Sequence, residues 1–205
     1  MVAKSLLCTA SRNVALVVAS EVNSRRLAHS QATGEFRGLF GDAACAFVLT
    51  RSAGGDGGSI NRLGDFVCGC SGTFASALEM SLGERGQLDV QFKGEQLASA
   101  AIGTLDRVLG DLEIAVGKPR SAASYFALHE PNPRVVEIFA QRVGIPTEKI
   151  AMVSRSSGNL GSATCGVSLS MALSHLNSNS SVTAPPLILV AAVGPGLVWA
   201  GTYIH

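Results

Sequence analysis

Two residues able to do chemistry lie 30 positions apart, His129 in the segment 128–134 and Asn159 in the segment 157–163. Each lies where a predicted strand gives way to a loop that leads into a helix. Because such exits in α/β proteins place side chains at the carboxyl ends of strands, we expect both to face one cavity. A neutral imidazole and a primary amide there form a pair of uncharged hydrogen-bond donors. Such a pair suits a carbonyl oxygen that becomes an oxyanion or an enolate.

Two other interpretations of His129 compete with this one. A lone histidine at a strand end is more often a structural hydrogen-bond partner than a catalyst, although Asn132 and Asn159 favour function. A Cys, His and Asn set also suggests a thiol protease. That class needs its cysteine in a particular local context near the mature start, and Cys8 lacks this context. The structural and catalytic roles of His129 therefore stay open at this point.

The composition narrows the class of protein. The 205 residues are 47% hydrophobic with 23 Gly and 5% aromatic residues, which allows one or two domains with a real core. A net charge of +1 favours neither nucleic acid nor a membrane surface as a partner. No apolar run reaches the roughly 18 residues of a membrane helix. The apolar start Met1–Cys8 is cut by Ser11–Asn13, so we expect no secretory signal.

The five cysteines follow no disulfide framework, which favours reduced thiols in a cytoplasmic compartment. Cys68 and Cys70 form a Cys-x-Cys rather than a metal-binding or redox Cys-x-x-Cys, so we expect no metal site and plain core or loop thiols. The run 54–58 is glycine-rich, but no Lys-Ser or Lys-Thr follows it, so it predicts a surface turn rather than a phosphate loop.

Hydrophobic patterning predicts strands that alternate with helices, which indicates a sheet covered by helices on both faces. Segment 2–10 is predicted to be the tail of a helix. Strands are predicted at 14–19, 44–50, 125–128, 150–153, 187–193 and 197–204. Helices are predicted at 93–116, 133–143 and 160–176, with a polar linker at 177–183.

Several segments together resemble β-ketoacyl-ACP synthase III, a family of condensing enzymes. They are His129-Glu130-Pro131-Asn132-Pro133-Arg134, Gly144-Ile145-Pro146-Thr147-Glu148-Lys149-Ile150, Gly158-Asn159 with its small-residue helix, Gly194-Pro195-Gly196-Leu197-Val198-Trp199, and Leu39-Phe40-Gly41-Asp42-Ala43 after the segment 15–25. The resemblance covers nearly the whole chain in the same order. Pro195 is also reminiscent of chalcone-synthase relatives.

The resemblance implies an α/β thiolase-like layered sandwich of duplicated βαβαβαββ halves, with the first half truncated. It divides the chain into a remnant of the N-terminal half, residues 1–93, and a C-terminal half, residues 94–205. It also implies a decarboxylative Claisen condensation of an acyl thioester with malonyl-ACP, in fatty acid or polyketide synthesis, without a cofactor. Acyl-CoA and an acyl carrier protein are the implied partners.

The same resemblance assigns roles to single residues. His129 and Asn159 match the family histidine and asparagine that donate to the extender thioester carbonyl as its enolate forms. Asn132, Gly194 and Gly196 match substrate-binding positions, Asn132 near the pantetheine arm. Arg134 matches a basic residue that docks the acidic carrier protein.

Departures from the family pattern lead to a further expectation. The family nucleophile begins a helix of roughly 20 residues, about 30 Å long at 1.5 Å per residue, before the strand at 14–19. Only thirteen residues precede Val14, and Cys8 lies too close to that strand. We therefore expect the nucleophile segment to be lacking. Ala43 and Cys45 replace family glycines, and Pro195 has no N–H to offer to an oxyanion.

Three functional hypotheses follow. The chain is part of a true acyltransferase whose front portion is supplied elsewhere or was lost in gene prediction, a non-catalytic partner subunit of such a synthase, or an inactive fragment. A homodimer or pairing with a complementary synthase chain is expected, with neither nucleic acid nor membrane as a partner.

Overall fold

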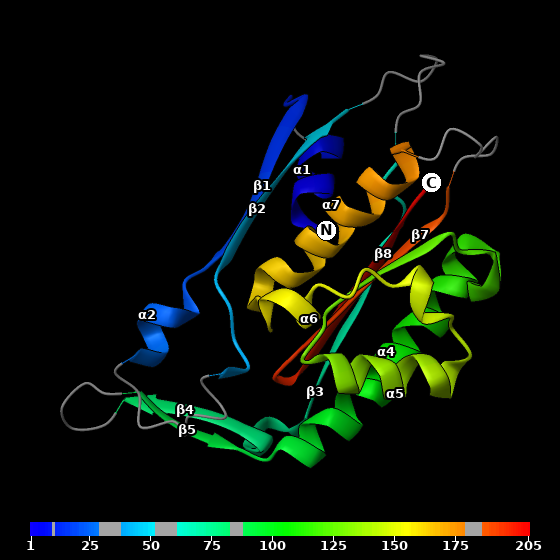
Figure 1. The fold of residues 1–205 in the computed structure, drawn as a ribbon. Helices are drawn as coiled ribbons and strands as arrows, with labels where there is room; N and C mark the ends of the chain where they lie inside the picture. Colours follow the sequence, from blue (N-terminus) through cyan, green and yellow to red (C-terminus); the bar gives the residue numbers. More distant parts are fainter. Residues whose placement is uncertain (10, 29–37, 52–60, 83–87, 179–185) are drawn as a thin grey trace.

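The computed structural model describes residues 1–9, 11–28, 38–51, 61–82, 88–178 and 186–205 (Figure 1). Along the chain the elements are α1 (Val2–Thr9), β1 (Val14–Glu21), α2 (Asn23–Ala28), β2 (Ala43–Thr50), β3 (Val67–Phe74), β4 (Leu78–Leu82), β5 (Leu88–Phe92), α4 (Gly94–Val116), β6 (Tyr125–Leu128), α5 (Pro133–Val143), α6 (Ser154–Ser157), α7 (Thr164–Ser178), β7 (Ile188–Gly194) and β8 (Gly196–Ile204). Short 3-10 turns lie at Ala75–Ala77, Arg120–Ala122, Thr147–Lys149 and Gly161–Ala163.

The main sheet has four strands in the order β3-β8-β7-β6. Strands β7 and β8 form an antiparallel hairpin, β3 is antiparallel to β8, and β6 is parallel to β7. Phe126 and Leu128 point into a core with α4 and α5, whereas Ala127 points into a core with α7. Helices cover both faces of the sheet, so the side chains on both sides of its central strands are buried. The sequences of these strands are therefore continuously apolar.

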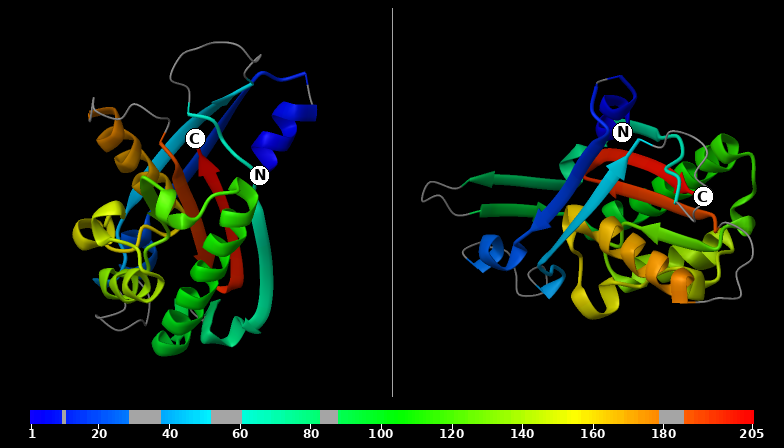
Figure 2. Two further views of the ribbon diagram at one scale, coloured as in Figure 1. Left: turned by 90° about the vertical axis from the view of Figure 1, so that its right-hand side faces the viewer. Right: turned by 90° about the horizontal axis from the view of Figure 1, so that it is seen from above.

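The two other sheets of the described chain are antiparallel pairs, β1 with β2 and β4 with β5. Helix α7 lies between the β1–β2 ribbon and the main sheet (Figures 1 and 2). Gly166 of α7 allows this approach, because a Cβ there would collide with Cys45 of β2. Ala19, Ala43 and Cys45 pack on this inner side against the region of Val153, Leu160 and Ala163. The layers therefore run ribbon, helix, sheet, helix.

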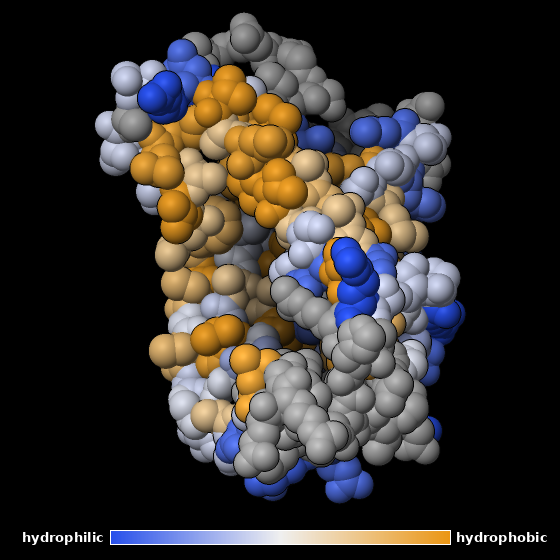
Figure 3. Space-filling view, turned by 90° about the vertical axis from the view of Figure 1, so that its left-hand side faces the viewer, coloured by the Kyte–Doolittle hydropathy of each residue, from blue (hydrophilic) through white to orange (hydrophobic). Residues whose placement is uncertain are grey.

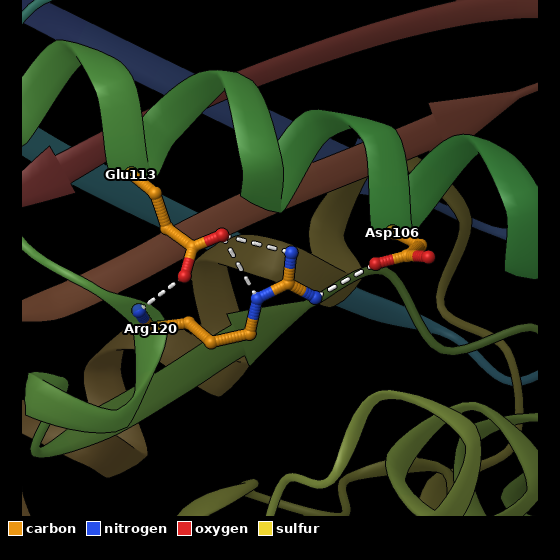
Figure 4. Close-up of polar contacts among 3 residues, drawn as sticks. All are labelled: Asp106, Glu113 and Arg120. Atoms are coloured by element: carbon orange, nitrogen blue, oxygen red, sulfur yellow. Dashed lines mark hydrogen bonds and ion pairs between the residues drawn. The ribbon is translucent and has the colours of Figure 1, made fainter.

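Helix α4 ends in a polar network that joins it to the following turn (Figure 4). Arg120 Nε and Nη2 donate to Glu113 Oε2 at 3.1 and 2.9 Å, and Arg120 Nη1 donates to Asp106 Oδ1 at 2.7 Å. The Arg120 backbone N–H also donates to Glu113 Oε1 at 2.6 Å. The guanidinium holds the pKa of Glu113 below its usual value. The network fixes the chain where it leaves α4 to enter β6.

Most elements lie where the sequence predicted them. Segment 125–128 is β6 and segment 133–143 is α5 without any change of bounds, and the predicted strands at 14–19, 44–50, 187–193 and 197–204 agree within two residues. The tail helix ends at Thr9, and the long helix begins at Gly94 rather than residue 93. The predicted turn at 54–58 lies outside the described residues, as does most of the linker at 177–183.

The strand predicted at 150–153 is wrong. Ile150 makes only an isolated bridge to Phe126, and the chain then turns into α6. The backbone N–H groups of Val153 and Ser154 donate to the Glu130 carboxylate, so they are not available to a neighbouring strand. Asn159 consequently follows a short helix and not a strand. The helix predicted from residue 160 begins at Thr164, after a 3-10 turn.

Strands β3, β4 and β5 were missed. Strand β3 lies within residues 1–93, which we assigned to the N-terminal half, and it pairs with β8 in the main sheet. Cys68 and Cys70 are exposed on this strand, so they are neither core nor loop thiols. Within the described residues, no helix has the length and apolar character needed to cross a membrane.

Candidate active site

His129 lies directly after β6, at the carboxyl end of that strand. Its backbone N–H donates to Ala191 O of β7 at 2.8 Å, which continues the parallel pairing by one residue. Desolvation by burial lowers the pKa of the imidazole from 6.5 to about 4, while a hydrogen bond with the Gly161 backbone acts in the opposite direction. At neutral pH the imidazole is therefore uncharged, and the single N–H that it then carries donates to the Gly161 carbonyl.

Asn159 is held in place by its backbone and its side chain together. Its N–H donates to Leu39 O at 2.7 Å, and its carbonyl accepts from Gly41 N at 3.1 Å. The side-chain Oδ1 accepts from Gly161 N at 2.9 Å. Within the described residues, Asn159 Nδ2 makes no hydrogen bond. Every buried side-chain N or O of these residues has a hydrogen-bond partner, so Nδ2 is not buried. The amide is therefore oriented with its Nδ2 donors accessible.

Gly161 links the two candidate residues, because its backbone contacts both His129 and Asn159. The sequence predicted that His129 and Asn159 face one site, and the structure places both side chains in contact with the backbone of Gly161. Gly161 has a φ of +55°, and a Cβ there would lie 2.8 Å from Cδ of Glu21. Both observations require glycine at this position.

Glu130 is a site residue that the sequence analysis missed. Its side chain is fully buried, next to His129, and accepts from Val153 N at 3.2 Å, Ser154 N at 2.9 Å and Ser154 Oγ at 2.7 Å. Burial raises the pKa of this carboxyl, against the effect of the three hydrogen bonds. An acidic residue two positions after the end of an apolar strand was the signal available in the sequence, since buried carboxylates need partners.

The other predicted residues have different settings. Asn132 Oδ1 accepts from Val135 N at 3.0 Å and so caps α5, with Pro133 as the first residue of that helix. Arg134 is exposed on the first turn of α5 and makes no ion pair within the described residues. Gly194 and Gly196 flank the turn between β7 and β8, and Gly196 has a φ of +128°. This turn lies at the same end of the sheet as His129, because β6 and β7 run parallel.

The five thiols differ in their surroundings. Burial raises the pKa of Cys165 to about 12, and its Sγ donates to Ala191 O at 3.4 Å. Cys45 is half-buried against Ala163 O. Cys8, Cys68 and Cys70 are exposed. Within the described residues, no three acidic, His or Cys side chains gather to hold a metal ion.

Comparison with solved structures defines the class of protein. The β-ketoacyl-[acyl carrier protein] synthase III of Thermus thermophilus matches with a TM-score of 0.82 at 21% identity, over 98% of this chain and 62% of that chain. The priming β-ketosynthase of the R1128 polyketide biosynthetic pathway matches with a TM-score of 0.79 at 24% identity, over 99% of this chain and 60% of that chain. The chain therefore has the thiolase-like fold of condensing enzymes, as the sequence predicted.

Sequence comparison then identifies the family. The model of the 3-oxoacyl-[acyl-carrier-protein (ACP)] synthase III family matches residues 1–72, and the model of that synthase's C-terminal domain matches residues 116–205. The β-ketoacyl-[acyl-carrier-protein] synthase III of Ehrlichia chaffeensis is 28% identical over 97% of this chain and 60% of that protein. The chain belongs to the β-ketoacyl-[acyl-carrier-protein] synthase III family. It spans about 60% of the length of the curated relatives it matches.

Proposed function

We propose that this chain supplies the extender side of a decarboxylative condensation of the β-ketoacyl-ACP synthase III type. The observation that carries the proposal is the meeting of His129 and Asn159 at the Gly161 backbone, with the Asn159 Nδ2 donors accessible. Two neutral donors held close together are suited to a carbonyl oxygen that gains negative charge.

In the proposed reaction a malonyl thioester loses CO₂, and the electron pair of the broken C–C bond forms an enolate. The enolate oxygen accepts from Asn159 Nδ2 and from the His129 N–H, which it shares with the Gly161 carbonyl. The carbanion carbon then attacks the carbonyl of an acyl-cysteine, and the cysteine thiolate leaves. A neutral His129 fits this role because it stabilises the oxyanion without transferring a proton to it, and its lowered pKa keeps it neutral.

The substrates in this proposal are acyl-CoA and malonyl-ACP. Arg134 is exposed at the start of α5, on the helix that follows the His129 loop, and so presents a cation to an acidic carrier protein near the site. Asn132, Gly194 and Gly196 would line the path of the extender arm. A cytoplasmic location and a homodimer, or pairing with a complementary synthase chain, belong to the same proposal.

We place the acyl-accepting cysteine outside these five thiols. Cys165 lies beside His129, because both residues donate to Ala191 O, but a pKa of about 12 leaves almost no thiolate at neutral pH. The check is mass spectrometry after incubation with acyl-CoA. Acylation of one of the five cysteines that depends on His129 would overturn this part of the proposal.

The second candidate function is a non-catalytic partner subunit. It is favoured by the burial of Cys165, the thiol beside His129, because burial raises the pKa of that thiol to about 12. In that case His129 and Asn159 would serve stability or partner binding alone.

A double-mutant cycle on malonyl-thioester decarboxylation separates these functions. His129→Ala and Asn159→Ala should each slow the release of CO₂ by about 10² to 10³, since each removes one donor to the same oxyanion. The double variant should fall short of the product of the two losses, because the donors act on one atom. Wild-type rates in both single variants would leave the partner-subunit function.

A further inference from the structure

We propose that Glu130 is a positioning residue: its carboxylate holds the start of the segment that carries Asn159 against the loop that carries His129. This inference rests on the proposed function for its catalytic consequence, but its structural half is measurable without any activity. We call the carboxylate with its three donors, from Val153 and Ser154, the Glu130 clamp.

The position of the clamp between the two candidate residues is the first argument. Glu130 follows His129 directly, so its backbone moves with the imidazole. Its acceptor bonds go to Val153 N, Ser154 N and Ser154 Oγ, at the start of α6. Asn159 follows that helix after Gly158, whose φ of +70° turns the chain sharply. A displacement at Ser154 is therefore carried through one helical turn to Asn159.

The composition of the clamp is the second argument. Three donors converge on one carboxylate in a fully buried setting. A charged acceptor forms shorter and stronger bonds than a neutral one, so the clamp fixes the distance between the two segments closely. The Glu130 carboxylate is also costly to bury, and burial raises its pKa. A buried charge that costs stability is typical of sites where position matters more than stability.

The segment has a second anchor, which makes the role of the clamp specific. Asn159 bonds through its backbone to Leu39 and Gly41, on the side of β2. The clamp is the corresponding attachment on the side of β6. The segment is thus held between the two layers, and releasing the clamp frees only the side that faces His129.

The test is a titration of His129 by NMR in the chain labelled at histidine, with the resonance assigned by its loss in His129→Gln. Glu130→Gln keeps the length of the side chain but replaces one acceptor oxygen with an NH₂ group that faces N–H donors. Ser154→Ala removes only the hydroxyl donor. Val136→Ala, at a buried position of α5 outside the clamp, is the control for general loss of stability.

In the wild type we expect a midpoint of about 4. Glu130→Gln should raise this midpoint toward 6.5, because a released segment lets water reach the imidazole. Loss of the negative charge of Glu130 alone would lower the midpoint. The effect of the charge and the effect of hydration therefore have opposite signs. Ser154→Ala should give a smaller rise, and Val136→Ala none. If Glu130→Gln does not fold, the Ser154→Ala titration decides the question.

A midpoint in Glu130→Gln that stays at the wild-type value, or falls, overturns the proposal. Decarboxylation of malonyl-CoA is followed in the same proteins, where Glu130→Gln should lower kcat by at least about tenfold with little change in KM, since small misplacements of donors cost up to about 10²-fold. A wild-type chain without decarboxylase activity would contradict the proposed function. The titration would still decide whether Glu130 positions the two segments.

Discussion

His129 combines two properties that are seldom found in an exposed histidine. It is neutral at physiological pH because desolvation lowers its pKa to about 4, and it is fixed by contacts from two segments, Ala191 to its backbone and Gly161 to its ring. A fixed neutral donor loses little by reorganisation when negative charge develops beside it. The cost of this arrangement is a dependence of stability on pH.

That dependence gives a prediction. A histidine with a lowered folded-state pKa is protonated first in the unfolded chain, so stability is present above 6.5 and is lost as the pH falls toward about 4. The loss amounts to at most about 3 kcal/mol, at 1.36 kcal/mol per pKa unit. His129→Gln should remove it, as measured by urea unfolding across this range. The raised pKa of Glu130 changes stability with pH in the opposite direction, and it does so in the wild type and in His129→Gln alike. An equal pH dependence of stability in these two proteins would contradict the prediction.

Asn132 has a structural task besides any contact with substrate. Since its Oδ1 caps α5, Asn132→Ala should cost about 1 kcal/mol in the free energy of unfolding. Asn132→Asp keeps the cap and should retain that stability. If Asn132→Asp keeps stability but loses decarboxylation, the amide also touches the extender arm. Equal stability of the Ala and Asp variants in urea unfolding would rule out the cap as a stabilising contact.

At the scale of elements, the predictable segments are those that carry their own boundary signals. Helix α5 begins with Asn132 and Pro133 and ends at Gly144, whose φ of +70° closes it. Strand β3 has no such signals: it is rich in small residues, and it forms because it pairs with β8. Gly69 lies under the ring of Trp199, a contact that no local pattern indicates.

The candidate site follows the same rule. The resemblance to a known family predicted His129 and Asn159, because their motifs are local. The contact that joins them is made by the Gly161 backbone, and the clamp is made by Glu130 across more than twenty positions. Backbone partners and long-range hydrogen bonds have no residue type of their own in the sequence, so they became visible only in the structure.

The network at the end of α4 gives the prediction at this scale. Arg120→Met should lower the free energy of unfolding by about 1 to 2 kcal/mol, because it leaves Glu113 and Asp106 without their shared partner. The side chain of Arg120 is 21% exposed, so water compensates part of the loss. Lys118→Met removes an exposed charge nearby and is the matched control. Equal midpoints of the two variants in urea would show that the network adds nothing.

At the scale of the whole molecule, the β1–β2 ribbon is unlike the main sheet. Val14, Leu16 and Val18 are 60 to 65% exposed, and Val48 of the neighbouring strand is 65% exposed. Figure 3 shows the hydrophobic residues that gather on this face of the molecule. The apolar, β-branched composition of these strands suits burial on both sides, yet one face is exposed in the structure.

The hydrogen bonds show which residues form the open edge. Arg51 N donates to Asn13 O at 2.9 Å, and this pair continues the register of β1 with β2. Odd-numbered residues of β1 therefore direct their backbone groups toward β2, and Val14, Leu16 and Val18 direct theirs away from it. In the described chain no strand pairs with that edge. An apolar strand with free backbone groups is a template for pairing with another chain.

We therefore expect the chain to self-associate through β1, and a single charge on the open edge should prevent it. Val18→Lys places an ammonium group where the side chain is 60% exposed and the backbone groups are free. Ile114→Lys adds the same charge on α4, where the side chain is 83% exposed, far along the chain from the ribbon. Sedimentation velocity over a range of concentrations should show association for the wild type and Ile114→Lys, and monomers for Val18→Lys. A monomeric wild type, or equal behaviour of the two lysine variants, would mean that the edge is already protected or that net charge alone controls association.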